Sequence, residues 1–359
     1  MKIIEVKTKK EKKEYIKFIY ELYKNDKNFC DMNITFVKNF LYKKDTYAKK
    51  CEILPIFIKD KNAVKLECMY IIDSSEEIKL SFVEFRKNSK KYLIELIKYS
   101  KIILKKYNKK KVIVGINGQI SYGLGILTKD YNREFEFNSN YNLDYYTKEM
   151  DEVFPIIKKA FSYKYKATNS LSLFDKNILD NVYNNYEFRY LNKKNFKKDI
   201  LIFGDLCHKS LNGTPYYTKK TPKEMYELMK QIKFIMRKED IIFAMKDGKE
   251  VGYVYTHPDY AELFDKPKLN YIKFYLKYLF KKTHNVIYNV IGVLPEHQLS
   301  GLAIALIHKS ILVRQYKYPY GVSSFILEDN IPSTKLCRKL SIGINKEYHL
   351  YEINGDNNV

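Results

Sequence analysis

The sequence predicts a mixed α/β protein built from two domains, and three observations lead to this prediction. The chain has 359 residues, more than one domain usually holds. Runs typical of strands alternate with runs typical of helices in both halves. Hydrophobic residues make up 45% and aromatic residues 15% of the chain, which is enough for two sizeable cores.

The first half is predicted to run strand, helix, three strands, helix, strand. Its helices are expected because apolar residues recur at helical spacing, for example Leu93, Leu96 and Leu104. Its strands are expected where branched and aromatic residues gather. In chain order, the predicted elements are 2–6, 10–23, 53–58, 63–72, 78–85, 91–107 and 111–115.

The second half is predicted to follow a polar join at 153–185, rich in Ser and Thr near 164–173. Thr221, Pro222 and Glu224 together form the signature of a helix start. Asp247-Gly248 is a turn signal inside a hairpin. A Tyr/Lys-rich insertion at 263–282 is predicted to be helical in part and to cover an acceptor site. The predicted elements are the strand 186–190, the helices 196–211 and 221–236, and the hairpin 241–255.

The most informative stretch joins a strand-type run at 285–294 to an apolar, helix-type run at 302–312. The first four N–H groups of a helix have no partner inside it, and together with the helix dipole they attract anions. Gly301 and Ala303 have little or no side chain, so we expect a phosphate to approach the backbone of this turn.

The six residues Gln298-Leu-Ser-Gly-Leu-Ala303 resemble the coenzyme A pyrophosphate loop of the GNAT acyltransferases, Arg/Gln-x-x-Gly-x-Gly/Ala. A second block, 322–342, resembles the part of that family that closes the acyl-CoA site, with Asn330, Ser333 and Leu336 at matching positions. A final strand-type run, 347–353, follows. The resemblance implies an α/β (α+β) fold of two tandem GNAT-like domains, each with a mixed, mostly antiparallel central sheet flanked by helices.

The resemblance also implies roles for individual residues. The backbone near Val293 would hold the thioester oxygen, and Asn330 would contact the pantetheine arm, with Ser333 beside it. Cys337 stands where the family often has a Tyr that protonates the departing thiolate, and we weigh this role against that of a small buried apolar residue. Glu328 and Tyr288 are candidate bases, with Glu296 as a third. The pyrophosphate would lie on Gln298, Leu299, Ser300, Gly301, Leu302 and Ala303.

The first half resembles an uncharacterised group of bacterial tandem-GNAT proteins through residues 81–85, 115–127 and 140–146. It lacks the pyrophosphate motif, which we expect after the strand 111–115, where 116–125 is Gly-rich instead. We therefore expect a degenerate GNAT-like domain at 1–160, which shapes the acceptor pocket or a dimer surface. An inter-domain crossover is expected at 161–185 and the acyl-CoA-binding domain at 186–359.

The composition argues against several other classes of protein. The net charge is +23, yet only six of the 65 basic residues are Arg, the residue preferred for contacts to bases and phosphates, so we expect no specific nucleic-acid partner. The five Cys are widely spaced, which predicts neither a disulfide framework nor a metal site. The chain begins with polar residues and has no apolar run of about 18 residues, so we expect a cytoplasmic protein with no membrane partner.

The sequence therefore predicts an N-acyltransferase that uses acetyl-CoA or another acyl-CoA as co-substrate, needs no metal, and acts on a small-molecule or peptide amine. Two alternatives stay open: a transferase that takes aminoacyl groups from charged tRNA, and a non-catalytic CoA-binding protein. A homodimer also stays open. His208 lies next to Cys207, but adjacent positions of a helix do not face each other, so no thiol–imidazole pair is expected.

Overall fold

The computed structural model describes residues 1–131, 136–137, 139–265 and 270–355, with the backbone alone at 32–33. The chain divides into two compact units. Unit 1 holds Met1–Phe161, Leu263–Lys281 and Lys346–Val359, and unit 2 holds Ser162–Glu262 and Lys282–Asn345. Residues 346–359 thus group with unit 1, whereas the sequence placed them in a second domain at 186–359. The expected limits 1–160, 161–185 and 186–359 stay predictions.

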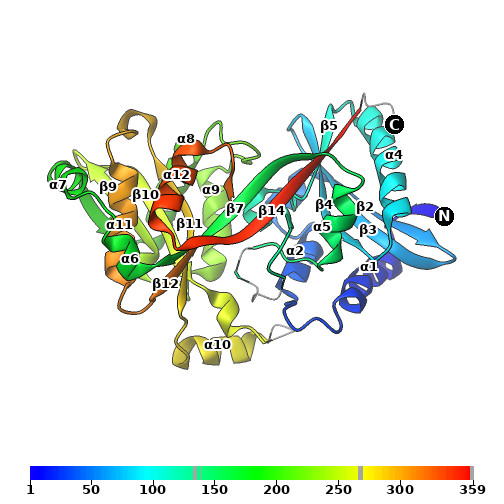
Figure 1. Ribbon diagram of the computed structural model, residues 1–359, viewed down its shortest axis with the longest axis horizontal. Helices are drawn as coiled ribbons and strands as arrows, with labels where there is room; N and C mark the ends of the chain where they lie inside the picture. Colours follow the sequence, from blue (N-terminus) through cyan, green and yellow to red (C-terminus); the bar gives the residue numbers. More distant parts are fainter. Residues whose placement is uncertain (132–135, 138, 266–269, 356–359) are drawn as a thin grey trace. The chain divides into compact units, whose positions relative to one another are not determined.

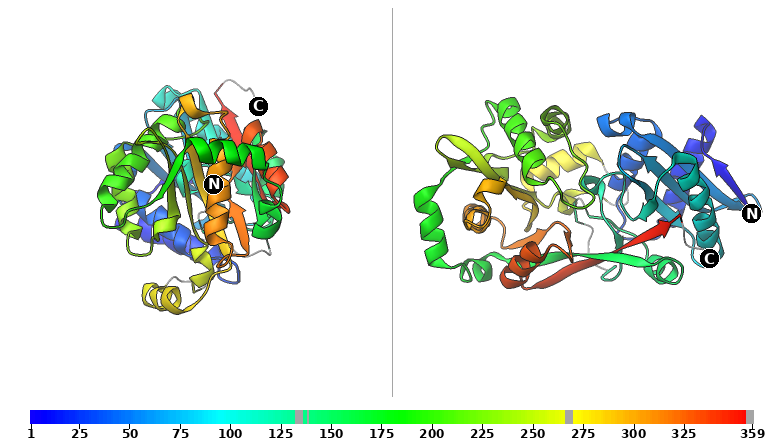
Figure 2. Two further views of the ribbon diagram at one scale, coloured as in Figure 1. Left: turned by 90° about the vertical axis from the view of Figure 1, so that its left-hand side faces the viewer. Right: turned by 90° about the horizontal axis from the view of Figure 1, so that it is seen from above.

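Unit 1 has one sheet with helices on both faces, and its elements are coloured along the chain in Figures 1 and 2. The strand order is β1-β2-β3-β4-β5-β14, with β6 beside β14. All of these pairs are antiparallel except β4 with β5. The elements are β1 Lys2–Glu5, α1 Lys9–Leu22, α2 Met32–Leu41, α3 Thr46–Lys50, β2 Glu52–Asp60, β3 Ala63–Ile72, β4 Glu77–Phe85, α4 Lys90–Tyr107, β5 Lys111–Val114, β6 Ile126–Leu127, α5 Tyr145–Asp151, the start of β7 Ile156–Lys166, α10 Tyr271–Phe280 and most of β14 Gly343–Asn354.

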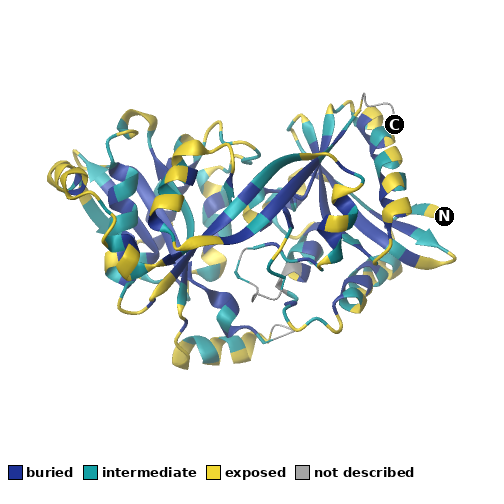
Figure 3. Ribbon diagram, viewed as in Figure 1, coloured by how far each residue is buried: buried dark blue, intermediate teal, exposed yellow. Residues whose placement is uncertain are grey.

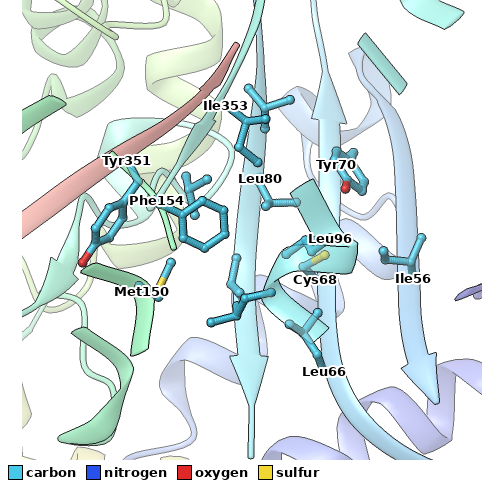
Figure 4. Close-up of a cluster of buried hydrophobic side chains, with 14 of the residues drawn as sticks. Ile56, Leu66, Cys68, Tyr70, Leu80, Leu96, Met150, Phe154, Tyr351 and Ile353 are labelled. Carbon is cyan, nitrogen blue, oxygen red and sulfur yellow. The ribbon is translucent and has the colours of Figure 1, made fainter. Parts of the chain in front are cut away.

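Alternation along the strands of unit 1 builds two cores. Ile56 and Ile58 of β2 point to the face covered by α4 and α5, whereas Phe57 points to the face covered by α1 and α2. Figure 4 shows the first of these clusters, in which Leu96 of α4 and Met150 of α5 lie against the strands. The predicted helix 91–107 is confirmed as α4, because its apolar positions recur at helical spacing on the buried face.

Unit 2 repeats this arrangement. The strand order is β8-β9-β10-β11-β12-β7, and β13 also pairs with β7. Only β11 and β12 run parallel among the pairs with a described register. The elements are the end of β7, α6 Ala167–Leu171, α7 Lys176–Asn185, β8 Glu187–Tyr190, α8 Phe196–Ser210, α9 Pro222–Met229, β9 Ile241–Lys246, β10 Lys249–Pro258, β11 Asn285–Val293, α11 Leu302–Arg314, β12 Tyr320–Ser323, β13 Ile326–Leu327 and α12 Ile331–Leu340.

The two faces of the sheet in unit 2 carry different helices. Phe243 and Tyr253 point to the face covered by α8 and α9, and Ile242 and Val254 point to the face covered by α7 and α11. In both units, therefore, the two early helices cover one face of the sheet. The helix that lies between the two parallel strands covers the other face.

Two local expectations have clear outcomes. The helix start at Thr221 is confirmed: its side chain and that of Glu224 cap each other's backbone, with Pro222 in the first turn. The segment 153–185 is more than a polar join, because it contains β7, α6 and α7. Its Ser and Thr residues misled the interpretation, since Ser170 is buried and its hydroxyl donates to the carbonyl of Leu340 at 2.8 Å. The insertion 263–282 is helical at α10, and residues 266–269 lie outside the described part.

Candidate acyl-CoA site in unit 2

The parallel strands β11 and β12 separate halfway along β11. Their register runs from Asn285 beside Tyr320 to Tyr288 beside Ser323, where β12 ends, while β11 continues to Val293. On its other edge β11 stays paired with β10, with a bulge that leaves Asn289 as the extra residue. The edge of β11 from 289 to 293 thus has no strand partner on the β12 side within the described chain.

The direction of the backbone groups follows from one hydrogen bond. The N–H of Leu294 donates to the carbonyl of Val251 in β10 at 2.9 Å. Because N–H groups alternate along a strand, the N–H groups of Val293 and Ile291 point away from β10, toward the open edge. The side-chain amide of Gln298 donates to the carbonyl of Val293 at 3.3 Å on that edge. An amide donor at Val293 is therefore available beside the gap, where the resemblance required one.

The turn after β11 presents a row of amides. A short 3₁₀ turn, Pro295–His297, leads to Leu299 at φ +64° and Gly301 at φ +83°. Leu299 is fully exposed, and a left-handed conformation is uncommon for such a residue. Among the hydrogen bonds of the described residues, none has as its donor the backbone N–H of Leu299, Ser300, Gly301, Ala303 or Ile304. In this row, only the N–H of Leu302 donates a hydrogen bond, to the hydroxyl oxygen of Ser300 at 3.3 Å.

The expectation that a phosphate approaches the backbone of this turn stays a prediction, but the missing side chain of Gly301 also has a structural reason. A Cβ at this position would lie 2.7 Å from Ile178 and 3.3 Å from Val182, both in α7. Gly301 therefore serves the left-handed start of α11 and its packing against α7. An anion would approach the turn through its backbone N–H groups.

In unit 1, a side chain of the chain itself bonds to the amides of the equivalent turn. By strand order, the counterpart of β11, α11 and β12 is β4, α4 and β5, so the counterpart turn is 86–89 and not 116–125 as we expected. There the carboxylate of Glu149 accepts from the N–H of Asn88 and from that of Ser89, each at 2.6 Å. A side chain of the chain itself occupies the start of α4 as an anion would.

The open edge in unit 1 is filled as well. β4 pairs with β5 only as far as Leu80, and two of the N–H groups beyond it find side-chain partners. The N–H of Phe82 donates to the side chain of Asn117 at 2.9 Å, and that of Phe85 to the hydroxyl of Tyr146 at 3.1 Å. In unit 1, two amides at the helix start and two on the strand edge thus bond to side chains of the chain itself.

Two of the predicted catalytic residues come together at the point where β11 and β12 separate. The rings of Tyr165 (β7) and Tyr288 are 5.7 Å apart, edge to face, and the hydroxyl of Tyr165 bonds to the sulfur of Cys337 in α12. Burial raises the pKa of the Cys337 thiol, although the bond from Tyr165 lowers it in part, so the thiol is protonated at neutral pH. Burial also raises the pKa of Tyr288 to about 12, which makes its hydroxyl a poor base. Tyr165 was missed because it lies in the segment interpreted as a join.

The remaining predicted residues divide between the site and the surface. Asn330 caps α12, its side-chain oxygen accepting from the N–H of Ser333 at 3.3 Å. Glu328 does not lie on a strand as expected, because it follows β13 in an exposed turn. Glu296 is exposed beside His297, whose Nδ1 lies 3.1 Å from the hydroxyl of Tyr186.

A cluster of polar groups lies on the α8 face of β11. Gly292 leaves room there: a Cβ at this position would lie 2.3 Å from the Ser210 hydroxyl and 2.6 Å from that of Tyr253. Tyr253 in turn bonds to the thiol of Cys207. This arrangement agrees with our expectation that Cys207 does not face His208.

Lys220 belongs to the same cluster, and its ammonium lies 5.7 Å from the centre of the Tyr217 ring. Burial lowers the pKa of Lys220 to about 8. Sequence reasoning missed this lysine because nothing distinguishes it from the other lysines of the chain.

The described residues contain no cluster of three or more His, Cys, Asp or Glu side chains suited to a metal ion. None of the described helices has the length and apolar character needed to cross a bilayer.

Comparison with known proteins identifies the fold. No protein-family model and no curated protein matches the sequence. A tandem GNAT protein from the clavulanic acid biosynthesis pathway aligns over 100% of this chain and 99% of its own, with a TM-score of 0.55 and 7% identity. A GCN5-related glucosamine N-acetyltransferase region of a fungal multi-domain GH3 β-N-acetylglucosaminidase aligns over 98% of this chain and 38% of its own, with a TM-score of 0.58 and 7% identity. A probable N-acyltransferase from Enterococcus faecalis aligns over 99% and 72%, with a TM-score of 0.50 and 9% identity.

Proposed function

We propose that this chain, which has the tandem GNAT fold, is an N-acyltransferase whose unit 2 binds acetyl-CoA or another acyl-CoA. The observation that carries the proposal is the contrast between the two units. The turn into α11 leaves five amides without an acceptor beside an unpaired strand edge, whereas the turn into α4 holds Glu149 and its strand edge is filled. The first N–H groups of a helix have no partner inside it and attract anions, so the open row in unit 2 suits an anion.

In this proposal the diphosphate lies on the amides of residues 299–304 and the thioester oxygen lies near the N–H of Val293. The pantetheine arm then follows the open edge of β11, with Asn330 and Ser333 on α12 beside it. As the amine attacks the thioester carbon, negative charge develops on the oxygen, and a fixed backbone N–H stabilises that charge more than it stabilises the uncharged thioester.

The two proton transfers of the reaction are assigned to Cys337 and Lys220. The carbon–sulfur bond breaks as the new carbon–nitrogen bond forms, and the departing thiolate takes a proton from the Cys337 thiol, which solvent then reprotonates. The amine loses its proton to Lys220, directly or through water, because the pKa of Lys220 is about 8 and a base works best near the working pH. Tyr288 is assigned to binding, since its raised pKa of about 12 does not suit a base. No proton transfer is assigned to Glu328.

Calorimetry with acetyl-CoA tests the cofactor part of the proposal. We expect one site per chain and a dissociation constant in the micromolar range, on the order of −8 kcal/mol. Absence of binding to acetyl-CoA, and to longer acyl-CoA esters, would contradict the proposal.

Thiol release from acetyl-CoA in the presence of an amine panel tests the chemistry. Cys337→Ala is expected to lower kcat while leaving acetyl-CoA binding unchanged, and Tyr165→Phe to lower it less. Lys220→Met is expected to lower kcat/KM and to remove the acidic limb of its pH profile, the fall in activity below about pH 8, with Lys219→Met as the neighbouring control. Binding without turnover on any amine would favour the non-catalytic alternative.

A further inference from the structure

Helix α10 (Tyr271–Phe280) exposes large apolar side chains along one whole face. Their exposed fractions are 75% for Ile272 and 84% for Phe280, and in Figure 3 this helix is coloured mostly as exposed. The six exposed residues, named here the α10 stripe, are Tyr271, Ile272, Tyr275, Leu276, Leu279 and Phe280. Isolated apolar side chains on a surface need no explanation, but a contiguous group of six marks a binding surface.

The spacing of these residues makes the stripe continuous. Positions i, i+1, i+4, i+5, i+8 and i+9 fall on one side of a helix with 3.6 residues per turn. The other side is anchored within unit 1: the rings of Phe274 and Phe264 are 5.6 Å apart, and Lys277 pairs with Asp265 at 2.6 Å. Asn270 caps the helix by accepting from the N–H of Lys273 at 3.0 Å. The helix is therefore held with the stripe outward.

The charged residues of the helix and of the segments directly next to it are all of one sign. Residues 270–282 contain four Lys and no Asp or Glu. Lys273 is exposed in the first turn of the helix, and Lys281 and Lys282 are exposed directly after its last residue. An apolar face bordered by Lys, with Tyr and Phe among the apolar residues, is the composition of helices that lie in a membrane interface.

A second copy of this chain fits the same surface less well. Packing two α10 helices together would bring their lysines close to one another without a carboxylate on either helix. A helix of ten residues is also only about 15 Å long, so its face alone falls short of the roughly 800 Å² per partner that stable interfaces bury.

We propose that α10 docks the protein on an anionic lipid surface, with the helix axis parallel to the membrane plane. The stripe enters the boundary between head groups and acyl chains, and the lysines contact lipid phosphates. The sequence led us to expect no membrane partner because the chain lacks an apolar span, and docking of this kind needs none. The proposed docking of α10 on lipid is independent of the proposed acyl transfer.

Co-sedimentation of the purified full-length protein with lipid vesicles tests the proposal. One set of vesicles is phosphatidylcholine alone, and the other contains about 30% phosphatidylserine. We expect binding to the second set at least about tenfold stronger than to the first, and weaker at about 0.5 M salt. Phe280→Ser with Leu276→Ser is expected to reduce binding about tenfold or more, and Lys273→Glu with Lys282→Glu to do likewise.

The matched control is Phe234→Ser in unit 2, because Phe234 is 82% exposed but lies outside α10. The control is expected to bind vesicles as the unchanged protein does. Equal binding to both kinds of vesicle, no binding to either, or equal loss in the control would overturn the proposal. A dimer in sedimentation velocity that the stripe variants abolish, with vesicle binding unchanged, would assign α10 to self-association instead.

Discussion

Replacing Ala303 with glutamate puts a carboxylate at the start of α11, beside amides that have no acceptor in the described structure. Ala303 is half-buried at the second position of the helix, where a longer side chain can reach solvent or curl back toward the amides. Glu149 shows the expected geometry in unit 1, with both of its oxygens 2.6 Å from two such amides. Ala303→Glu should therefore supply an internal anion at the place proposed for the diphosphate.

The magnitude follows from charge. Two unit charges about 5 Å apart interact by about 1.3 kcal/mol at an effective dielectric constant of about 50. A diphosphate carries two such charges and must also compete for the amides, so the penalty is about 2 to 3 kcal/mol. That corresponds to roughly thirty- to 150-fold weaker binding of acetyl-CoA. The fold itself should gain about 0.3 to 1 kcal/mol, because a negative side chain near a helix N-terminus is stabilising.

Calorimetry with acetyl-CoA and thermal unfolding measure the two effects on the same sample. Ala303→Gln is the matched control, since it has the same length without the charge. We expect the glutamate variant to unfold at the same temperature as the control or higher, and to bind far more weakly. If the two variants bind within about threefold of each other, the amides at the start of α11 do not hold the diphosphate.

Three further predictions concern the fold. Glu149→Gln should lower the free energy of unfolding by about 2 kcal/mol in denaturant titrations, because two charge-assisted bonds to the start of α4 become weaker; no loss would contradict the capping role. Burial raises the pKa of Glu84 from 4.5 to about 7, against hydrogen bonds that lower it, so stability should fall by up to about 3 kcal/mol as pH rises between these values. Glu84→Gln should flatten that part of a stability–pH curve, and an unchanged slope would refute the assignment. Asp240→Asn should cost about 3 to 5 kcal/mol in the same titrations, because the buried guanidinium of Arg314, now 2.6 Å from the carboxylate, would lose its counter-charge; a loss below about 1 kcal/mol would contradict this.

The sequence predicted most elements correctly because their periodicity is strong. The predicted strand 63–72 matches β3, and the predicted helix 91–107 differs from α4 by one residue. The hairpin turn at Asp247-Gly248 is confirmed between β9 and β10. These signals are local, since a turn residue or an apolar spacing identifies its own element.

Non-local structure was harder to predict. Residues 153–185 looked like a join because they are polar, yet β7 completes the sheet of unit 2 beside β12. A polar residue can be buried when a hydrogen bond satisfies it. If the partner is distant in sequence, the local pattern around the residue does not reveal it. The bond between Ser170 and Leu340 spans 170 positions of the chain. Tyr165 was missed for the same reason, since its partners Tyr288 and Cys337 lie more than a hundred residues away.

The comparison of the two turns shows what a motif can and cannot establish. Every strand-to-helix turn offers unpaired amides, so the amides by themselves do not identify a ligand site. In unit 1 the deciding residue is Glu149, about 60 positions after the turn that it fills, and no spacing rule connects the two. In unit 2 the corresponding amides have no acceptor among the described residues, and the strand edge beside them is open. The choice of unit 2 as the acyl-CoA site therefore depends on a difference in internal capping. It is this difference that the exchange of Ala303 for glutamate would remove.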